Sequence, residues 1–273
     1  MTGARPTEER TIAEYLGTDL RETGDWERGE VVIEAEARLA PHLAGPAGGM
    51  RTGALLALVD NAGGLCAGLA ALPDGWVVST SLLARTTRLH HLGPLHLEAR
   101  VLRRGKAAVV TSVAVRDRGA GGTVVADAVL TSAVLVPEHG VPRWTRPLVL
   151  APEGSVDDPP PLLEWIGVHP IDGGLAAELR DELRNPWGIL HGGILATLVD
   201  AASELHAAER SGRPATTVDV ALHFLSPARV GPVHARVAHV GTRPDGHVAR
   251  VEIRDAGAAD RVCAVAVTTA RPL

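Results

Sequence analysis

The sequence predicts an α+β fold in which two tandem copies each wrap an antiparallel sheet around one long central helix. Two observations carry this prediction. The chain repeats itself at an offset of 140 residues, and each copy places one long helix inside a run of alternating, strand-like segments, without the βαβ alternation of a parallel sheet. The length of 273 residues suits two small domains as well as one large one.

The repeat is clearest before the central helices. When Asp60 is aligned with Asp200, the segment PAGGMRTGALLALVD lies over PWGILHGGILATLVD, and seven of the fifteen positions are identical. The short segments TIAEYLG and PLLEWIG precede these blocks in the two copies. A proline-rich stretch separates the copies. We therefore predict an N-terminal repeat over residues 1–137, a linker over 138–161 and a C-terminal repeat over 162–273.

Each copy has the same predicted order of elements, namely a short helix, a strand, a Gly-rich turn, the long helix and a run of strands. Alternation such as VVTSVAVRD indicates strands with one buried face. The first strand of each copy is expected at Glu30–Leu39 and at Leu175–Leu183. The later strands of the first copy are expected at Val77–Thr87, Leu95–Arg103, Ala107–Arg116 and Val124–Val136.

Composition limits the partners of the chain. A net charge of −5 argues against nucleic acid, and we expect no membrane span, because no apolar run approaches the ~20 residues of a spanning helix. The first residues do not resemble a signal peptide. Cys66 and Cys263 form no disulfide framework, so we expect reduced thiols and a cytoplasmic location. No Cys/His spacing suggests a metal centre.

The face of each long helix opposite its core stripe holds an acid, Asp60 in the first copy and Asp200 in the second. Glycine inside a helix costs about 1 kcal/mol relative to alanine, so Gly63, Gly64 and Gly68 need a reason. One reason is close packing against another backbone. The other is room for a ligand beside Asp60.

The turn before the second long helix contains most of the candidate catalytic residues. It reads Asn185-Pro-Trp-Gly-Ile-Leu-His191-Gly192-Gly193. Two glycines that open a helix leave backbone N–H groups at the positive end of its dipole, where they can bind a polarised carbonyl. Asn185 could add a side-chain donor, and a carboxylate in the same cleft could act as general base or nucleophile. His191 either contacts the substrate or only holds the turn.

With these motifs the sequence resembles the hotdog-fold acyl-CoA thioesterases of the phenylacetate-pathway and 4-hydroxybenzoyl-CoA type. The resemblance rests on Asn185, on the His-Gly-Gly turn, and on further segments of each copy. In the second copy these are Leu198-Val199-Asp200, Thr217-Val218-Asp219 and Phe224-Leu225-Ser226-Pro227, and in the first copy they are Leu58-Val59-Asp60-Asn61 and Arg104-Gly105-Lys106. It implies a tandem double hotdog, paired within one chain, with a continuous sheet and two helices side by side.

The resemblance also implies that each active site is shared between the repeats. The first site would join Asn185, His191, Gly192 and Gly193 to Asp60, with Ser79 or Thr80 as the positioning hydroxyl. The second would join Asp200 and Thr217 to the first copy's turn. That turn departs from the family pattern, with Gly45 for the Asn, Arg51 for the His and Thr52 for the first Gly. We therefore expect one competent and one degenerate site, where Asp200 could pair with Arg51.

The implied activity is hydrolysis of an acyl-CoA thioester or of an acyl-carrier-protein thioester. We expect no cofactor, since coenzyme A enters as part of the substrate, and we expect further association into a homo-oligomer. Candidates for contacting the coenzyme A phosphates are Arg103, Arg104, Lys106 and Arg229. Two alternatives remain at this point, a hotdog dehydratase or hydratase and a non-catalytic acyl-CoA-binding module.

Overall fold

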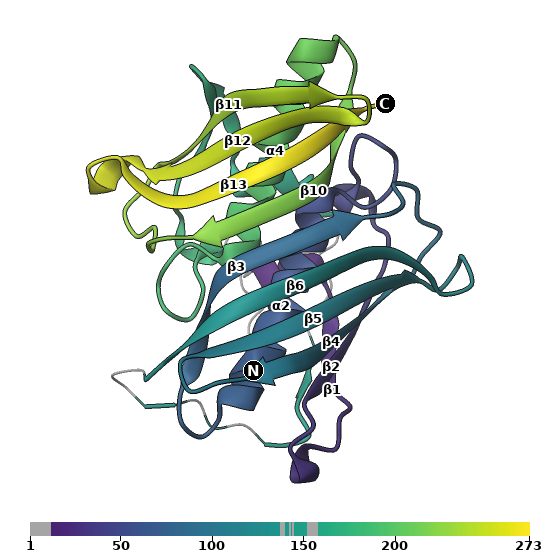
Figure 1. The fold of residues 1–273 in the computed structure, drawn as a ribbon, viewed down its shortest axis with the longest axis vertical. Coiled ribbons are helices and arrows are strands. Elements are labelled where there is room, and N and C mark those ends of the chain that lie inside the picture. Colours follow the sequence, from purple (N-terminus) through teal and green to yellow (C-terminus); the bar gives the residue numbers. More distant parts are fainter. Residues whose placement is uncertain (1–11, 137–139, 142, 144, 152–157) are drawn as a thin grey trace.

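The computed structural model describes residues 12–136, 140–141, 143, 145–151 and 158–273. Within these residues thirteen strands form one sheet, in the order β7-β1-β2-β4-β5-β6-β3-β10-β13-β12-β11-β9-β8. Figure 1 shows this sheet in front of the two long helices, α2 and α4. The fold is a tandem hotdog, as the sequence predicts.

The order of elements repeats along the chain. The first set is α1 (Ile12–Leu16), β1 (Asp19–Glu22), β2 (Val32–Ala37), α2 (Thr52–Ala71), β3 (Trp76–Thr86), β4 (Leu95–Arg104), β5 (Ala108–Asp117) and β6 (Thr123–Leu135). β7 (Val149–Leu150) lies between the sets. The second set is α3 (Leu162–Ile166), β8 (His169–Ile171), β9 (Gly174–Ala177), α4 (Gly192–Ser211), β10 (Ala215–Phe224), β11 (Val233–Arg243), β12 (Gly246–Asp255) and β13 (Arg261–Pro272). Short 3-10 turns cover Trp26–Arg28, Pro41–Leu43, Asp181–Leu183 and Ala256–Ala258.

The two halves join through β3 and β10, which pair antiparallel in the middle of the sheet, with Leu83 opposite Ala221. Both strands carry a bulge on their other edge. The register shifts between Ser79 and Ser81 in β3 and between Thr217 and Asp219 in β10. A bulge re-aims the side chains beside it. The matching bulges therefore set the directions of Ser79 and Thr217 near the long helices.

One expectation needs correction at the edge of the sheet. The strand expected over Leu175–Leu183 ends at Ala177, because the chain leaves the sheet for the 3-10 turn at Asp181–Leu183. The described part of the expected linker contacts the first repeat. Its residues Val149–Leu150 pair with β1, and Arg146 forms an ion pair with the buried carboxylate of Glu22.

The expectation that no apolar run reaches the length of a membrane span is wrong for α2. This 20-residue helix is apolar enough, by length and composition, to cross a membrane. However, 83% of the window is buried inside the protein, where α2 packs against α4 and its own sheet. A mostly buried helix of this kind is a core helix, and its apolar character follows from that position.

Candidate functional site

The first cleft forms where the Gly-rich turn of the second half meets α2 of the first half. The Asp60 carboxylate is only 7% exposed, and its Oδ1 accepts a hydrogen bond from the Ser79 hydroxyl at 2.8 Å. Its Oδ2 lies 3.6 Å from His191 Nδ1. Of the two hydroxyls expected here, Ser79 therefore faces Asp60, whereas the Thr80 hydroxyl donates to the Thr131 carbonyl.

Gly192 brings the backbone of α4 directly against this carboxylate. A Cβ atom built on Gly192 would lie 2.7 Å from Asp60 Oδ2, and one built on Gly193 would lie 2.7 Å from the Cα of Ala57. Both distances are too short for any side chain. The two glycines are thus required by the close approach of α4 to α2.

The donors at the start of α4 differ from the expected pair. The Gly193 N–H is not free, because it donates to Nδ1 of His191, the N-cap residue, at 3.0 Å. The Gly192 N–H finds no protein acceptor in the part of the chain that the structure describes. One N–H at the positive end of the helix dipole is therefore available for a carbonyl oxygen, where the sequence suggested two.

His191 is held as a neutral ring. Burial lowers the pKa of its imidazole, against the opposing effect of the Asp60 charge. Because Nδ1 accepts the Gly193 N–H, the ring proton of the neutral form sits on Nε2. The structure thus gives His191 a clear part in holding the turn.

Asn185 shapes the turn with one end of its side chain. Its Oδ1 accepts the Trp187 N–H at 2.9 Å and, at the longer distance of 3.4 Å, the Ile189 N–H. The side-chain NH₂ forms no hydrogen bond within the described ranges, so it is available as a donor. Trp187 then crosses to the other half of the molecule, where its Nε1 donates to the Val77 carbonyl of β3 at 3.1 Å.

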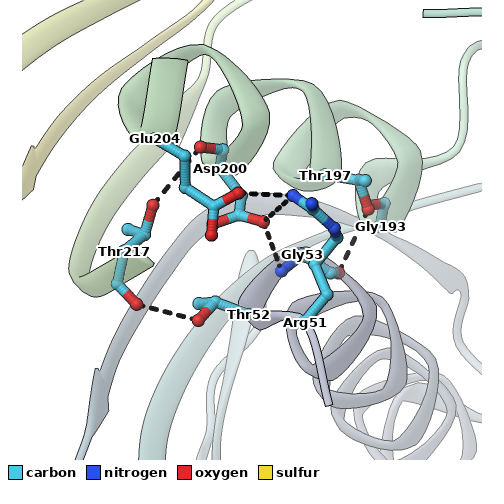
Figure 2. Close-up of polar contacts among 8 residues, drawn as sticks. All are labelled: Arg51, Thr52, Gly53, Gly193, Thr197, Asp200, Glu204 and Thr217. Atoms are coloured by element: carbon cyan, nitrogen blue, oxygen red, sulfur yellow. Dashed lines mark hydrogen bonds and ion pairs between the residues drawn. The ribbon is translucent and has the colours of Figure 1, made fainter. Parts of the chain in front are cut away.

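The second cleft is also formed by the turn before one long helix and the acid of the other. In this cleft, however, ion pairs link Arg51 to Asp200 and Glu204, as Figure 2 shows. Asp200 is fully buried. Its Oδ2 accepts the Gly53 N–H at 2.8 Å and lies 3.4 Å from Arg51 NH1. The same guanidinium nitrogen lies 2.5 Å from Glu204 Oε2. Arg51 thus fills the place that His191 holds in the first cleft.

Burial dominates the electrostatics of this cluster. It raises the pKa of Glu204 to about 8, assisted by the Asp200 charge and opposed by Arg51. The pKa of Asp200 is raised by the same burial, against Arg51 and the Gly53 N–H. Within the described residues, Asp200 Oδ1 and Glu204 Oε1 have no hydrogen-bond partner. Burial therefore favours the protonated form of both acids, and the single guanidinium of Arg51 opposes it.

The threonines around this cluster bind backbone. Thr217 donates to the backbone carbonyl of Asp200 at 3.3 Å, whereas Ser79 donates to the carboxylate of Asp60. The hydroxyl of Thr52 donates to the Thr217 carbonyl at 2.8 Å, and Thr197 donates to the Gly53 and Gly193 carbonyls. Thr217 also lies close enough to the Asp200 carboxyl for its hydroxyl to oppose the rise in the pKa of that acid.

The basic candidates lie in two separate places. Arg103, Arg104 and Lys106 are exposed on the β4–β5 hairpin, where Arg104 pairs with Asp74 after the end of α2. Arg229 is exposed on a loop beside the Gly-rich turn of the second half. There, the Leu190 N–H donates to the Ala228 carbonyl and Arg184 donates to the Arg229 carbonyl. Of these candidates, the structure places only Arg229 next to the turn of the first cleft.

Sequence reasoning missed three residues of these clefts. Glu204 aligns with Gly64 at the 140-residue offset. Because Glu204 lies one helical turn after Asp200, its position in the sequence could have indicated a second partner for Arg51. Trp187 and Trp76 gave no such signal. Their importance depends on contacts with β3 and with Gly68 that only the folded chain brings together.

The fold and the shared clefts define a tandem hotdog protein. Its residues 188–267 match the family model of the thioesterase superfamily. A 65-residue segment, 23% of the chain, is 38% identical to acyl-coenzyme A thioesterase 13 of Mus musculus and 42% identical to that of Homo sapiens. The match spans 46% of the length of each of these relatives.

Solved structures share the whole architecture. A candidate thioesterase II from Thermobifida fusca YX aligns over 99% of this chain and all of its own, with a TM-score of 0.63 and 19% identity. An acyl-ACP thioesterase from Bacteroides thetaiotaomicron aligns over 90% of this chain and 99% of its own, with a TM-score of 0.60 and 12% identity. At these identities the likeness establishes the fold.

Proposed function

We propose that this chain is a thioesterase that hydrolyses an acyl-CoA or acyl-carrier-protein thioester in the first cleft alone. The observation that carries the proposal is the meeting of Asp60 with Gly192 across the two halves. A buried carboxylate stands there beside a helix N-terminal N–H that has no protein acceptor among the residues that the structure describes. The names of the curated relatives support the same activity.

The residues of the first cleft divide the reaction between them. The Gly192 N–H, with the Asn185 NH₂, would bind the thioester oxygen and stabilise its developing negative charge. Asp60 would either take a proton from the attacking water or attack the carbonyl itself. Ser79, bonded to Oδ1, fixes the carboxylate so that its other oxygen faces the substrate. When water attacks, the C–S bond breaks and the proton taken by Asp60 passes to the leaving thiolate. When Asp60 attacks, the C–S bond breaks to give an anhydride with Asp60, and water hydrolyses this anhydride and supplies the proton to the thiolate. Either route yields a carboxylic acid and a thiol.

The second cleft keeps a buried acid, Asp200, but the groups around this acid are different. The Gly53 N–H, the counterpart of Gly193, is used by Asp200, and Arg51 and Glu204 occupy the space around that carboxylate. The Asp200 carboxylate is engaged by Arg51 and by the Gly53 N–H, so these groups stand between it and a substrate carbonyl. We therefore assign Asp200 to the structure of the interface and not to turnover.

The test is thiol release from a panel of acyl-CoA and acyl-carrier-protein substrates by the whole chain. We expect release by the wild type and a loss of at least a hundredfold in kcat for Asp60→Asn, which keeps the volume and removes the charge. Ser132→Ala, in β6, serves as a control. Binding of acyl-CoA without thiol release would indicate a binding module. Hydration of an enoyl-CoA without release would indicate a hydratase.

A further inference from the structure

The two clefts differ at one helical position beside the acid. Gly64 lies one turn after Asp60 on α2, and a Cβ atom built there meets no atom within 4 Å. Its counterpart on α4 is Glu204, whose buried carboxyl is bound to Arg51. The first cleft is therefore open at the point where a side chain fills the second. Gly64 is half-buried, so this space is reached from outside.

An indole ring bounds this space further along α2. A Cβ atom on Gly68, one turn beyond Gly64, would lie 2.6 Å from a ring carbon of Trp76. The ring thus rests directly on the helix. Since an α-helix rises about 1.5 Å per residue, Trp76 covers α2 about 12 Å from Asp60. The side chain of Trp187 contacts the next residue of β3, because its Nε1 donates to the Val77 carbonyl.

We propose that the acyl group of the substrate lies against Gly64 and ends at the Trp76 ring, so that Trp76 limits the acyl length. This inference rests on the proposed thioesterase function. The walls favour an acyl group, because they are glycine backbone and indole carbon. The basic loop of Arg229 lies instead beside the turn of the second half, on the side suited to the phosphates of coenzyme A.

The distance sets the expected length. Carbon–carbon bonds of about 1.5 Å advance an extended chain by roughly 1.3 Å per carbon, so about 12 Å holds roughly nine carbons. The specificity constant kcat/KM should rise with chain length up to about an octanoyl or decanoyl group and fall beyond it. Each buried methylene changes binding by a factor of about four, so the rise should be steep.

The experiment compares kcat/KM for straight-chain acyl-CoAs from butanoyl to hexadecanoyl. Trp76→Ala should raise the ratio of dodecanoyl to octanoyl activity at least tenfold, and Trp76→Phe should change it little. Gly64→Leu should lower activity on all but the shortest acyl groups. The leucine enters open space and replaces a helical glycine, so this variant should fold at least as well as the wild type. Glu209→Leu, on the exposed end of α4, is the matched control.

Two outcomes overturn the inference. An unchanged length profile in Trp76→Ala and Gly64→Leu would show that the acyl group lies elsewhere. A rise in the KM of these variants by the same factor at every chain length would show that the space holds the pantetheine arm of the coenzyme. Failure of the proposed function looks different, because the wild type itself would then release no thiol from any acyl-CoA.

Discussion

Removing Arg51 should destabilise the fold strongly, because it leaves two carboxyl groups inside the interface between α2 and α4. The substitution is Arg51→Met, which keeps much of the side-chain volume and removes the charge. In the folded protein the Asp200 side chain is fully buried, that of Glu204 is 8% exposed, and one guanidinium nitrogen serves both. Figure 2 shows that this nitrogen bridges the two acids.

The magnitude follows from that burial. Breaking a buried ion pair by removing one partner costs about 3–5 kcal/mol, because the remaining charge stays out of water. Glu204 relieves part of this by holding a proton at neutral pH, since its pKa is raised to about 8. We therefore expect a loss of about 3 kcal/mol, which corresponds to a fall in Tm of roughly 6–12 °C for a chain of this size.

The assay is urea unfolding at pH 7, with Glu204→Gln as the matched variant. A glutamine can still accept from Arg51, and it replaces a carboxyl that is already protonated, so its cost should stay below about 1 kcal/mol. The reasoning is refuted if Arg51→Met unfolds within about 1 kcal/mol of the wild type. It is also refuted if Glu204→Gln costs as much as Arg51→Met.

Three further predictions concern the acids and donors of the two halves. Burial keeps a proton on Glu204 that the unfolded chain loses above the ordinary pKa of 4.5. The unfolding free energy should therefore fall between about pH 5 and 8, by up to about 1.4 kcal/mol per pH unit, and Glu204→Gln should remove this contribution. Urea unfolding measures the free energy at each pH, and an equal dependence on pH in the wild type and in Glu204→Gln would contradict the prediction. Asn185→Asp keeps the oxygen that holds the Trp187 N–H and loses the NH₂ donor, so kcat should fall about 10²–10³-fold with little change in Tm. An unchanged kcat would exclude Asn185 as a donor. The Asp255 carboxylate accepts hydrogen bonds from the N–H groups of Arg229, Val230 and Gly231. Asp255→Leu should therefore lower the unfolding free energy by more than about 2 kcal/mol, which thermal unfolding measures. A wild-type Tm in this variant would show that the loop does not depend on these bonds.

Much of the fold could be predicted because its signals are local and occur twice. The alternation of VVTSVAVRD gives β5, and the aligned blocks that end at Asp60 and Asp200 give α2 and α4. The ends of elements depend on contacts that no local pattern encodes. β9 stops at Ala177 because the chain turns away from β11, and β7 forms because the linker returns to β1.

The candidate site was predictable in its residues and less so in its hydrogen bonds. The meeting of Asp60 with the Gly192 turn follows from the family resemblance and the pairing of two copies. The use of the Gly193 N–H by His191 depends on the position of one ring, which the sequence does not specify. Two of the three glycines of α2 pack against side chains, whereas the first explanation expected packing against another backbone. Gly63 packs on Leu130 and Gly68 lies under Trp76, while Gly64 faces open space.

The central claim is that one cleft, formed by Asp60 and the turn at Gly192, carries out the reaction. A crystal structure of the whole chain with a non-hydrolysable acyl-CoA analogue tests this claim most directly. The account predicts one analogue per chain, with its carbonyl oxygen within hydrogen-bond distance of the Gly192 N–H and its carbonyl carbon facing Asp60. An analogue bound beside Asp200, with Arg51 displaced from it, would contradict the account.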